Sequence, residues 1–141
     1  MSYVLGIDKG TTTTKVSIFE AANGRVVATA RRATQSFRPR PDWHEEDMTG
    51  TYDTVAAAIR DAIATAGIPG AAIKGVGVSG HMGGLWALDS RGAPAGPAIA
   101  WPDGRAASML EAWKADGRVE ELFAISGNAP IPGLPLVLLA W

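Results

Sequence analysis

Three apolar runs joined by two short connections constrain the fold of this chain more than any other feature. Residues 3–8, 13–20 and 25–33 are predicted as strands, with 9–12 and the pair Asn23-Gly24 between them. An Asn-Gly pair between apolar runs is a strong hairpin signal because both residue types tolerate a positive φ. Connections this short join neighbouring antiparallel strands, so the chain is predicted to begin with an antiparallel β-meander.

Helical and extended patterns alternate after the meander. A polar, proline-containing loop over 34–46 is followed by apolar residues at spacings of three and four, which predict a helix near 48–66. Further expected elements are a buried strand over 73–79, a strand over 84–89, an extended piece over 98–101 and helices over 104–115 and 118–125. A β-meander followed by mixed helices and strands predicts an α/β fold.

The first connection has the composition of a phosphate-binding turn. Asp8 ends the first strand, where its carboxylate can hold Mg²⁺ directly or through water. Gly10 allows a sharp turn that brings backbone N–H groups close to an anion. Hydroxyls and an ammonium group that can contact phosphate follow on Thr11, Thr12, Thr13 and Lys15. The alternative is an ordinary hairpin with a polar turn and a solvated lysine.

Composition narrows the range of partners. The chain has 141 residues, of which 47% are hydrophobic and 19% charged, as in a single globular domain. Its 13 basic and 14 acidic residues give a net charge of -1, with no basic excess for nucleic acid or an anionic membrane. Cysteine is absent, which excludes disulfides and a thiol nucleophile. We therefore expect no nucleic-acid or membrane partner and a cytoplasmic location.

A glycine motif over 75–80 matches the dinucleotide fingerprint G-x-G-x-x-G. That fingerprint requires its glycines between a strand and a helix, whereas these lie inside the predicted strand. A nicotinamide site would need a helix from His81 onward. The motif more simply lets a ligand or another backbone approach closely.

Two other segments carry chemistry. Trp101 can stack on a sugar, and Asp103 and Arg105 can bind hydroxyls or phosphoryl oxygens; the alternative is a core tryptophan with an Asp–Arg pair capping a helix. His81, in a glycine-rich turn, faces a ligand or fills a structural role. The acidic run Glu45-Glu46-Asp47 is predicted to lie at a helix start, where it would stabilise the helix dipole.

Four motifs together resemble the N-terminal domain of the FGGY carbohydrate kinases, most closely the xylulokinase-like branch. They are Asp8–Lys15, Trp43–Asp47, Val78–Gly84 and Trp101–Arg105, in that order and spacing, and the resemblance covers essentially all 141 residues. It implies a ribonuclease H-like lobe of the actin, Hsp70 and sugar kinase type. In such a lobe helices flank a mixed sheet that contains an antiparallel meander. It would be one of two lobes beside a deep cleft.

The resemblance also implies ATP, Mg²⁺ and transfer of the γ-phosphoryl group to a hydroxyl of a pentulose or related polyol. Asp8 would hold the metal. The phosphates would be contacted by Gly10, Thr11, Thr12, Thr13 and Lys15. The sugar would be bordered by His81, Met82, Trp101, Asp103 and Arg105.

Departures from the family pattern leave the sugar open. Xylulokinases typically read Gln-Met-His-Gly where this chain has His81-Met82-Gly83-Gly84, Pro102 stands at a usually polar position, and Lys9 replaces Leu or Gln. Erythritol, glycerol and ribulose stay open as substrates. So does a different class of protein, a non-catalytic actin-like or Hsp70-like ATP-binding module, although Trp101 with Asp103 and Arg105 favours a sugar pocket.

The last residues, Pro135–Trp141, have the pattern of an apolar helix start without a polar face. We therefore expect the chain to be the front part of a longer protein; the alternative is a terminal segment that packs into the chain's own core. No residue matches the family's catalytic base, which is expected beyond Trp141 together with the C-terminal nucleotide-binding lobe. The expected partners are a sugar or polyol and that lobe, and a homodimer stays open.

Overall fold

The computed structural model describes all residues from Met1 to Trp141. They form two compact units, one made of 1–35 with 49–81 and the other of 36–48 with 82–141. None of the helices combines the length and apolar character needed to cross a bilayer.

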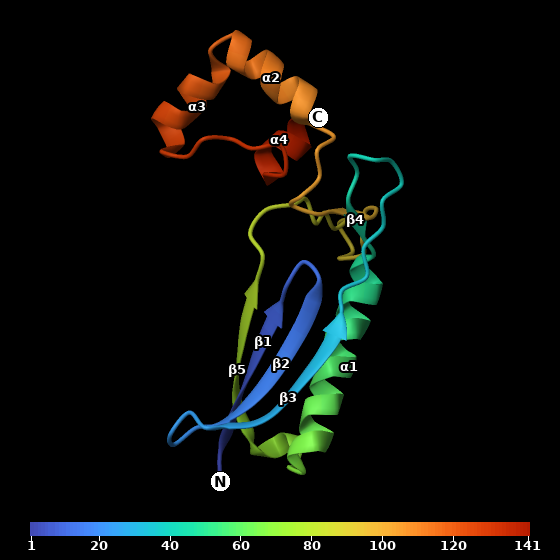
Figure 1. The fold of residues 1–141 in the computed structure, drawn as a ribbon, viewed down its shortest axis with the longest axis vertical. Coiled ribbons are helices and arrows are strands. Elements are labelled where there is room, and N and C mark those ends of the chain that lie inside the picture. The colour runs from blue at the N-terminus through green and yellow to red at the C-terminus, as the bar shows by residue number, and fades with distance from the viewer. The chain divides into compact units, whose positions relative to one another are not determined.

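A four-stranded mixed sheet with one long helix makes up the first unit (Figure 1). Its strands are ordered β3-β2-β1-β5: β1, β2 and β3 are antiparallel neighbours, and β5 runs parallel to β1. Their bounds are Tyr3–Lys9 for β1, Thr13–Glu20 for β2, Val26–Ala33 for β3 and Ile73–Gly80 for β5. The helix α1 spans Met48–Ala66, and a short 3₁₀ turn, η1, spans Gly70–Ala72. The predicted meander, mixed sheet and long helix are thus confirmed.

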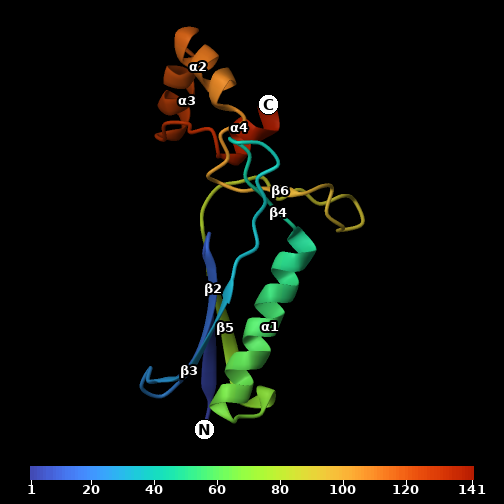
Figure 2. The same ribbon diagram turned by 45° about the vertical axis from the view of Figure 1, so that its right-hand side comes forward.

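The core of this unit lies between α1 and one face of the sheet, which the helix follows along its length (Figure 2). Successive strand residues point to opposite faces, so the alternating apolar residues of β1 and β2 all reach the helix. The buried set is Leu5, Ile7, Val16, Ile18, Ala58 and Ala62. Because the helix contributes only two alanines to it, the helix backbone can approach the sheet closely.

The second unit is a small sheet with three short helices. β4 (Glu45–Glu46) pairs antiparallel with β6 (Ala98–Ile99). The helices are α2 (Ala107–Ala115), α3 (Arg118–Ser126) and α4 (Pro135–Ala140). Their core consists of Ala106, Leu110, Trp113, Val137 and Leu138.

Three predicted elements differ from the structure. Residues 84–89 form no strand; Leu85 and Leu88 make single bridges, to Ile99 and Pro94. The helix predicted over 104–115 begins only at Ala107, because Asp103 and Arg105 are held in a loop. β5 is exposed rather than buried: it is the edge strand, with Val76 at 61% and Val78 at 74% exposure, because α1 covers β1 and β2 instead.

One further expectation fails, and one alternative is removed. Glu45 and Glu46 do not lie at a helix start, since they form β4 and the first turn of α1 contains no acidic residue. The dinucleotide fingerprint over 75–80 lies within β5, and no helix begins at His81. The nicotinamide alternative therefore lacks the strand–turn–helix unit that it requires.

Candidate functional site

An exposed carboxylate stands at the end of β1 in the first unit. Asp8 and Lys15 are paired in the β1–β2 register, and their charged atoms lie 3.3 Å apart. Both side chains are about half exposed, at 53% and 42%, so the ion pair itself adds little stability. A carboxylate that stays hydrated beside a lysine remains available to a cation or to a phosphate-bound metal.

The turn between β1 and β2 is closed by a hydrogen bond from Gly10 N–H to the Thr13 carbonyl oxygen, at 3.0 Å. A Cβ at Gly10 would lie 2.8 Å from that oxygen, so a side chain there would open the turn. Thr34 braces it from outside with a 2.9 Å hydrogen bond to the Gly10 carbonyl. Thr12 and Thr13 are exposed, whereas Thr14 faces the interior. The turn is therefore tight and braced, with hydroxyl groups on its open side.

Lys9 and His81 meet at the same end of the sheet. Lys9 is the last residue of β1, and His81 directly follows β5, which lies beside β1. The Lys9 Nζ atom lies 3.2 Å from His81 Nε2. An ammonium group only donates, so the imidazole nitrogen accepts and the ring is neutral in this contact. The sequence predicted a ligand-facing or structural histidine but not its contact with Lys9, 72 residues away.

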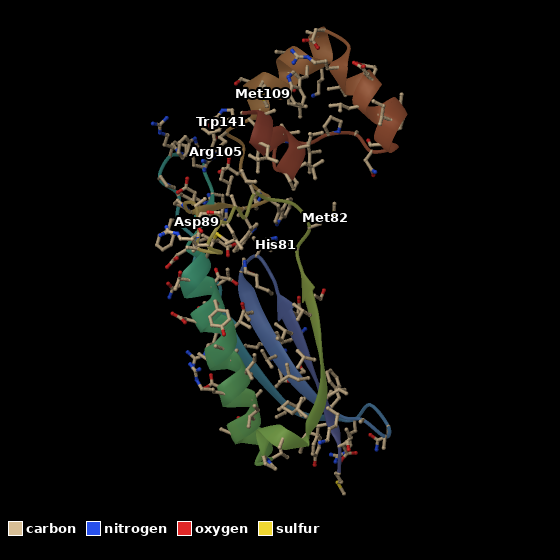
Figure 3. The ribbon with its side chains drawn as sticks, turned by 180° about the vertical axis from the view of Figure 1, so that it is seen from behind. His81, Met82, Asp89, Arg105, Met109 and Trp141 are labelled. Carbon is tan, nitrogen blue, oxygen red and sulfur yellow. The ribbon has the colours of Figure 1, made fainter.

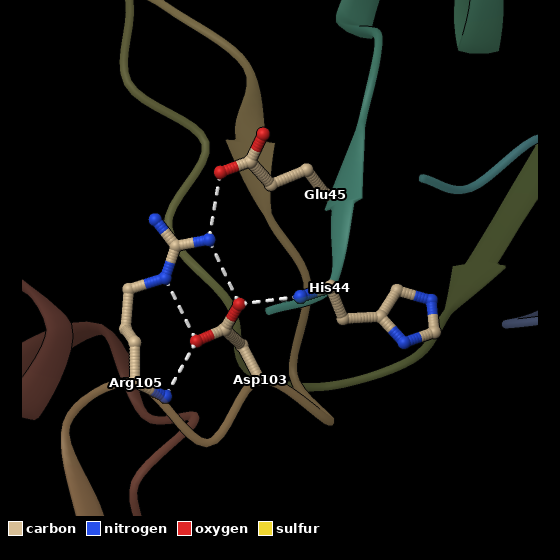
Figure 4. Close-up of polar contacts among 4 residues, drawn as sticks. All are labelled: His44, Glu45, Asp103 and Arg105. Atoms are coloured by element: carbon tan, nitrogen blue, oxygen red, sulfur yellow. Dashed lines mark hydrogen bonds and ion pairs between the residues drawn. The ribbon is translucent and has the colours of Figure 1, made fainter. Parts of the chain in front are cut away.

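A buried polar cluster organises the second unit (Figure 4). The Asp103 carboxylate accepts hydrogen bonds from the His44 backbone N–H at 2.6 Å and from Arg105 N–H and Nε, both at 2.8 Å. Arg105 Nη2 also donates to Asp103 and to Glu45, at 2.9 and 2.8 Å. The side chains of Asp103 and Arg105 are only 0% and 5% exposed. The cluster thus ties the loop before α2 to β4.

The electrostatics of this cluster favour the ionised form of both partners. Burial alone would raise the pKa of Asp103, but hydrogen bonds from Arg105 and from the His44 and Arg105 backbones outweigh it and hold the pKa below its ordinary value. Burial likewise works to lower the pKa of Arg105, and its bonds to Asp103 and Glu45 raise it instead. Two buried charges with well-placed partners satisfy each other and lock the loop.

Aromatic rings cover the same arginine. The Arg105 guanidinium carbon lies 3.9 Å from the centre of the Trp43 ring and 5.4 Å from that of Trp141. The two indoles meet edge to face, with centroids 5.8 Å apart. Arg105 therefore forms hydrogen bonds with carboxylates and stacks on indole, a combination that lysine could not replace.

Two of the predicted sugar-contacting side chains are exposed. Met82, which follows His81 (Figure 3), is 78% exposed, and Trp101 is 41% exposed. Both belong to the second unit. An exposed thioether and an exposed indole are able to contact the apolar face of a ligand.

The structure separates the sequence-predicted site residues into two groups. At one end of the sheet of the first unit lie Asp8, Lys15, His81 and the turn residues Gly10, Thr11, Thr12 and Thr13. Met82 and Trp101 are exposed in the second unit. Asp103 and Arg105 instead bind each other. This contact favours a structural role for the pair over direct sugar binding, although neither side chain caps α2.

Sequence reasoning missed three members of the cluster. Glu45 binds Arg105, His44 donates its backbone N–H to Asp103, and Trp43 stacks on the guanidinium. The run Trp43–Asp47 had been singled out only as a motif. A buried arginine is stabilised by a carboxylate that accepts its hydrogen bonds and by a flat apolar surface on which it stacks. That requirement was the only signal in the sequence that could have pointed to Glu45 and Trp43.

Comparison with known proteins identifies the family. The model of the FGGY family of carbohydrate kinases, N-terminal domain, matches residues 3–141. The chain belongs to this family. Its assignment confirms the predicted ribonuclease H-like lobe, since the solved FGGY kinases superpose on the whole chain.

Individual FGGY kinases are similar over most of this chain. L-xylulose/3-keto-L-gulonate kinase of Escherichia coli is 32% identical over 139 residues, covering 99% of this chain and 28% of that protein. Glycerol kinase of Citrifermentans bemidjiense is 36% identical over 119 residues, covering 83% of this chain and 24% of that protein. The chain thus spans about a quarter of the length of these relatives.

Solved structures of xylulose kinases also match nearly the whole of this chain and about a quarter of their own length. Xylulose kinase from Rhodospirillum rubrum is 31% identical with a TM-score of 0.86, covering 99% of this chain and 28% of that one. Ligand-bound xylulose kinase from Lactobacillus acidophilus is 28% identical with a TM-score of 0.91, covering 100% and 28%.

Proposed function

We propose that this chain is the sugar-binding N-terminal lobe of a kinase that transfers the γ-phosphoryl group of ATP to a hydroxyl of a pentulose, or of a related sugar or polyol. The observation that carries the proposal is the exposed Asp8 carboxylate beside Lys15 and the tight turn at Gly10, in a chain of the FGGY family. Phosphoryl transfer depends mainly on positioning and charge neutralisation, and this turn offers both.

The residues present fit Mg²⁺ bound together with nucleotide phosphates. Within residues 1–141, no group of three or more acidic or histidine side chains is placed to hold a metal ion, so this chain supplies no complete set of metal ligands. Mg²⁺ does not need one, since one or two carboxylates and phosphate oxygens complete its shell. Asp8 would hold the ion, which would neutralise phosphate charge, while Lys15 and the hydroxyls of Thr11, Thr12 and Thr13 would orient the phosphates.

In the second unit, the sugar would lie against Met82 and Trp101. In the first unit, His81 stays a proposed sugar contact. Relatives that act on L-xylulose, on 3-keto-L-gulonate and on glycerol support a small polyhydroxyl acceptor. We favour a xylulose-like pentulose because four of the similar proteins, named xylulose or L-xylulose kinases, match 99–100% of the chain. A glycerol kinase that matches 100% of it keeps glycerol as the alternative acceptor. Asp103 and Arg105 would act by holding the loop that carries Trp101, rather than through direct contact alone.

No residue of 1–141 is assigned as the catalytic base. Asp8 is proposed as a metal ligand and Asp103 is engaged by Arg105, so neither is placed to accept the proton of the sugar hydroxyl. We propose that the base and the adenosine site belong to a C-terminal lobe. A chain of residues 1–141 alone is then expected to show no kinase turnover.

A panel of ketoses and polyols assayed with ATP and Mg²⁺ tests the proposal on the full-length protein. ADP formation that depends on the added sugar, and is fastest with a pentulose, is the expected result. Quenching of tryptophan fluorescence by the same sugar, without nucleotide, would report sugar binding near a tryptophan such as Trp101. Nucleotide binding without sugar-dependent ADP formation would instead favour the non-catalytic ATP-binding module.

A further inference from the structure

Three backbone segments of the second unit meet at Trp101, and the glycines there are too close to neighbouring atoms to carry a Cβ without a shift. Two glycines of the first segment, Gly83 and Gly84, both have φ of +85°. The second segment carries Trp101 itself, two residues after the end of β6, and the third carries Gly133, just before α4. We call this arrangement the glycine clamp: Gly83, Gly84 and Gly133 around Trp101.

The contacts of Gly133 are the tightest in the clamp. A Cβ at Gly133 would lie 1.8 Å from the Trp101 carbonyl oxygen and 3.1 Å from its Cα atom. The φ of Gly133 is one that other residues also adopt, so space and not backbone conformation requires the glycine. An alanine would force the two segments apart by roughly 1.5 Å to restore van der Waals contact.

Gly84 joins the other two segments. Its N–H donates to the Gly133 carbonyl oxygen at 2.7 Å, and a Cβ on it would lie 2.6 Å from the Ile99 carbonyl oxygen. Gly83 is held in the same way, since its Cβ would lie 3.1 Å from the Gly133 carbonyl and 3.2 Å from Trp101 Cβ. The backbone at Trp101 is thus fixed from two sides, while its indole stays 41% exposed.

We propose that Gly133 is a positioning residue that holds the Trp101 indole in place for the sugar. The inference rests on the proposed sugar kinase function. Stacking of an aromatic ring on a sugar depends on the height and tilt of the ring, so a shift of the Trp101 backbone translates directly into weaker sugar binding. Gly133 acts only through Trp101 and touches neither the nucleotide nor the reacting atoms.

The first test compares two variants of the full-length protein. Gly133→Ala is expected to raise the KM for the sugar about tenfold and to leave the KM for ATP unchanged. The matched control is Gly96→Ala, in the same unit, because a Cβ at Gly96 meets nothing within 4 Å; both KM values should then stay at the level of the unmodified protein. An unchanged sugar KM in Gly133→Ala would overturn the inference.

A double variant shows whether Gly133 acts through the indole. Trp101→Ala removes the ring, so adding Gly133→Ala to it should raise the sugar KM no further. If the fold-increases in sugar KM caused by the two substitutions multiply in the double variant, Gly133 acts independently of the indole. That result would also overturn the inference. A rise in both KM values together would also overturn the inference, because Gly133 would then not act on the sugar site alone.

Hydrogen exchange on the unmodified protein covers the case in which Gly133→Ala does not fold. The Gly84 amide, bonded to Gly133, should exchange more slowly when the sugar is bound and at an unchanged rate when ATP alone is bound. If the exchange rate of the Gly84 amide were the same with and without bound sugar, the positioning role of Gly133 would be contradicted. If the unmodified protein phosphorylates no sugar at all, the proposed function fails first, and the inference fails with it.

Discussion

Two Asp-Gly-Arg tripeptides in this chain allow one test of how much burial adds to an ion pair. Asp103-Gly104-Arg105 and Asp116-Gly117-Arg118 share a local pattern in which the arginine N–H and Nε both bind the aspartate. Their surroundings differ, because the first pair is 0% and 5% exposed and the second 44% and 53%. The same substitution at the two aspartates therefore isolates the effect of burial.

Asp103→Asn should destabilise the protein by about 3 kcal/mol. Asp103 accepts four hydrogen bonds, from the His44 N–H and from the N–H, Nε and Nη2 of Arg105. An amide keeps one acceptor oxygen and turns a donor toward the others, so about two of the donors lose their partner, at roughly 1–3 kcal/mol each. Glu45 still binds the guanidinium, which keeps the loss toward the lower end of the range for a broken buried pair.

Urea unfolding followed by tryptophan fluorescence measures this effect, since Trp43 stacks on Arg105. Asp116→Asn, the matched control, should leave the midpoint unchanged because solvent replaces the lost bonds. Equal losses at both positions would refute the reasoning, because burial would then contribute nothing. So would an Asp103→Asn variant as stable as the unmodified protein.

Three further changes test other parts of the account. Since folding lowers the pKa of Asp103, the ionised carboxylate stabilises the folded state fully above its unfolded pKa near 3.8, and this stabilisation declines as pH falls through the folded pKa. Urea midpoints measured below about pH 4 should therefore depend less on pH in Asp103→Asn than in the unmodified protein. Ile18→Ala, in the fully buried core under α1, should cost about 2–5 kcal/mol in the same urea assay, whereas Val26→Ala, at an exposed position of β3, should change little. Asp8→Asn should lower sugar-dependent ADP formation by about a hundredfold or more through loss of metal binding, and Asp61→Asn, which breaks the exposed pair with Arg32, should not.

The sequence predicted best the elements whose signals are local. The Asn23-Gly24 hairpin and the spacing of apolar residues in α1 each depend on a short stretch of chain, and both agree with the structure. Strand β5 was placed within one residue of its true end, but its burial was misjudged. The exposure of Val76 and Val78 depends on where α1 packs on the sheet. That packing is a property of the tertiary structure, and the local sequence pattern of a strand does not reveal it.

In the candidate site, too, the residues that follow from a local sequence pattern were predicted, and those that depend on tertiary contacts were not. Asp8, Gly10 and Lys15 follow from one continuous stretch, and the structure places them together. The partners of Arg105 lie some 60 residues away, at Glu45 and Trp43, and no local pattern links them. The glycine clamp around Trp101 likewise joins three distant segments, so only the folded chain shows why Gly133 has no side chain.

Phosphorus-31 NMR of the full-length protein mixed with ATP, Mg²⁺ and a pentulose tests the central claim most directly, because it identifies the atom that receives the phosphoryl group. The account predicts that the γ-phosphate resonance of ATP is replaced by that of a sugar phosphate monoester, and that Asp8→Asn suppresses the exchange. Inorganic phosphate as the only new resonance, or no reaction with any sugar or polyol, would contradict it.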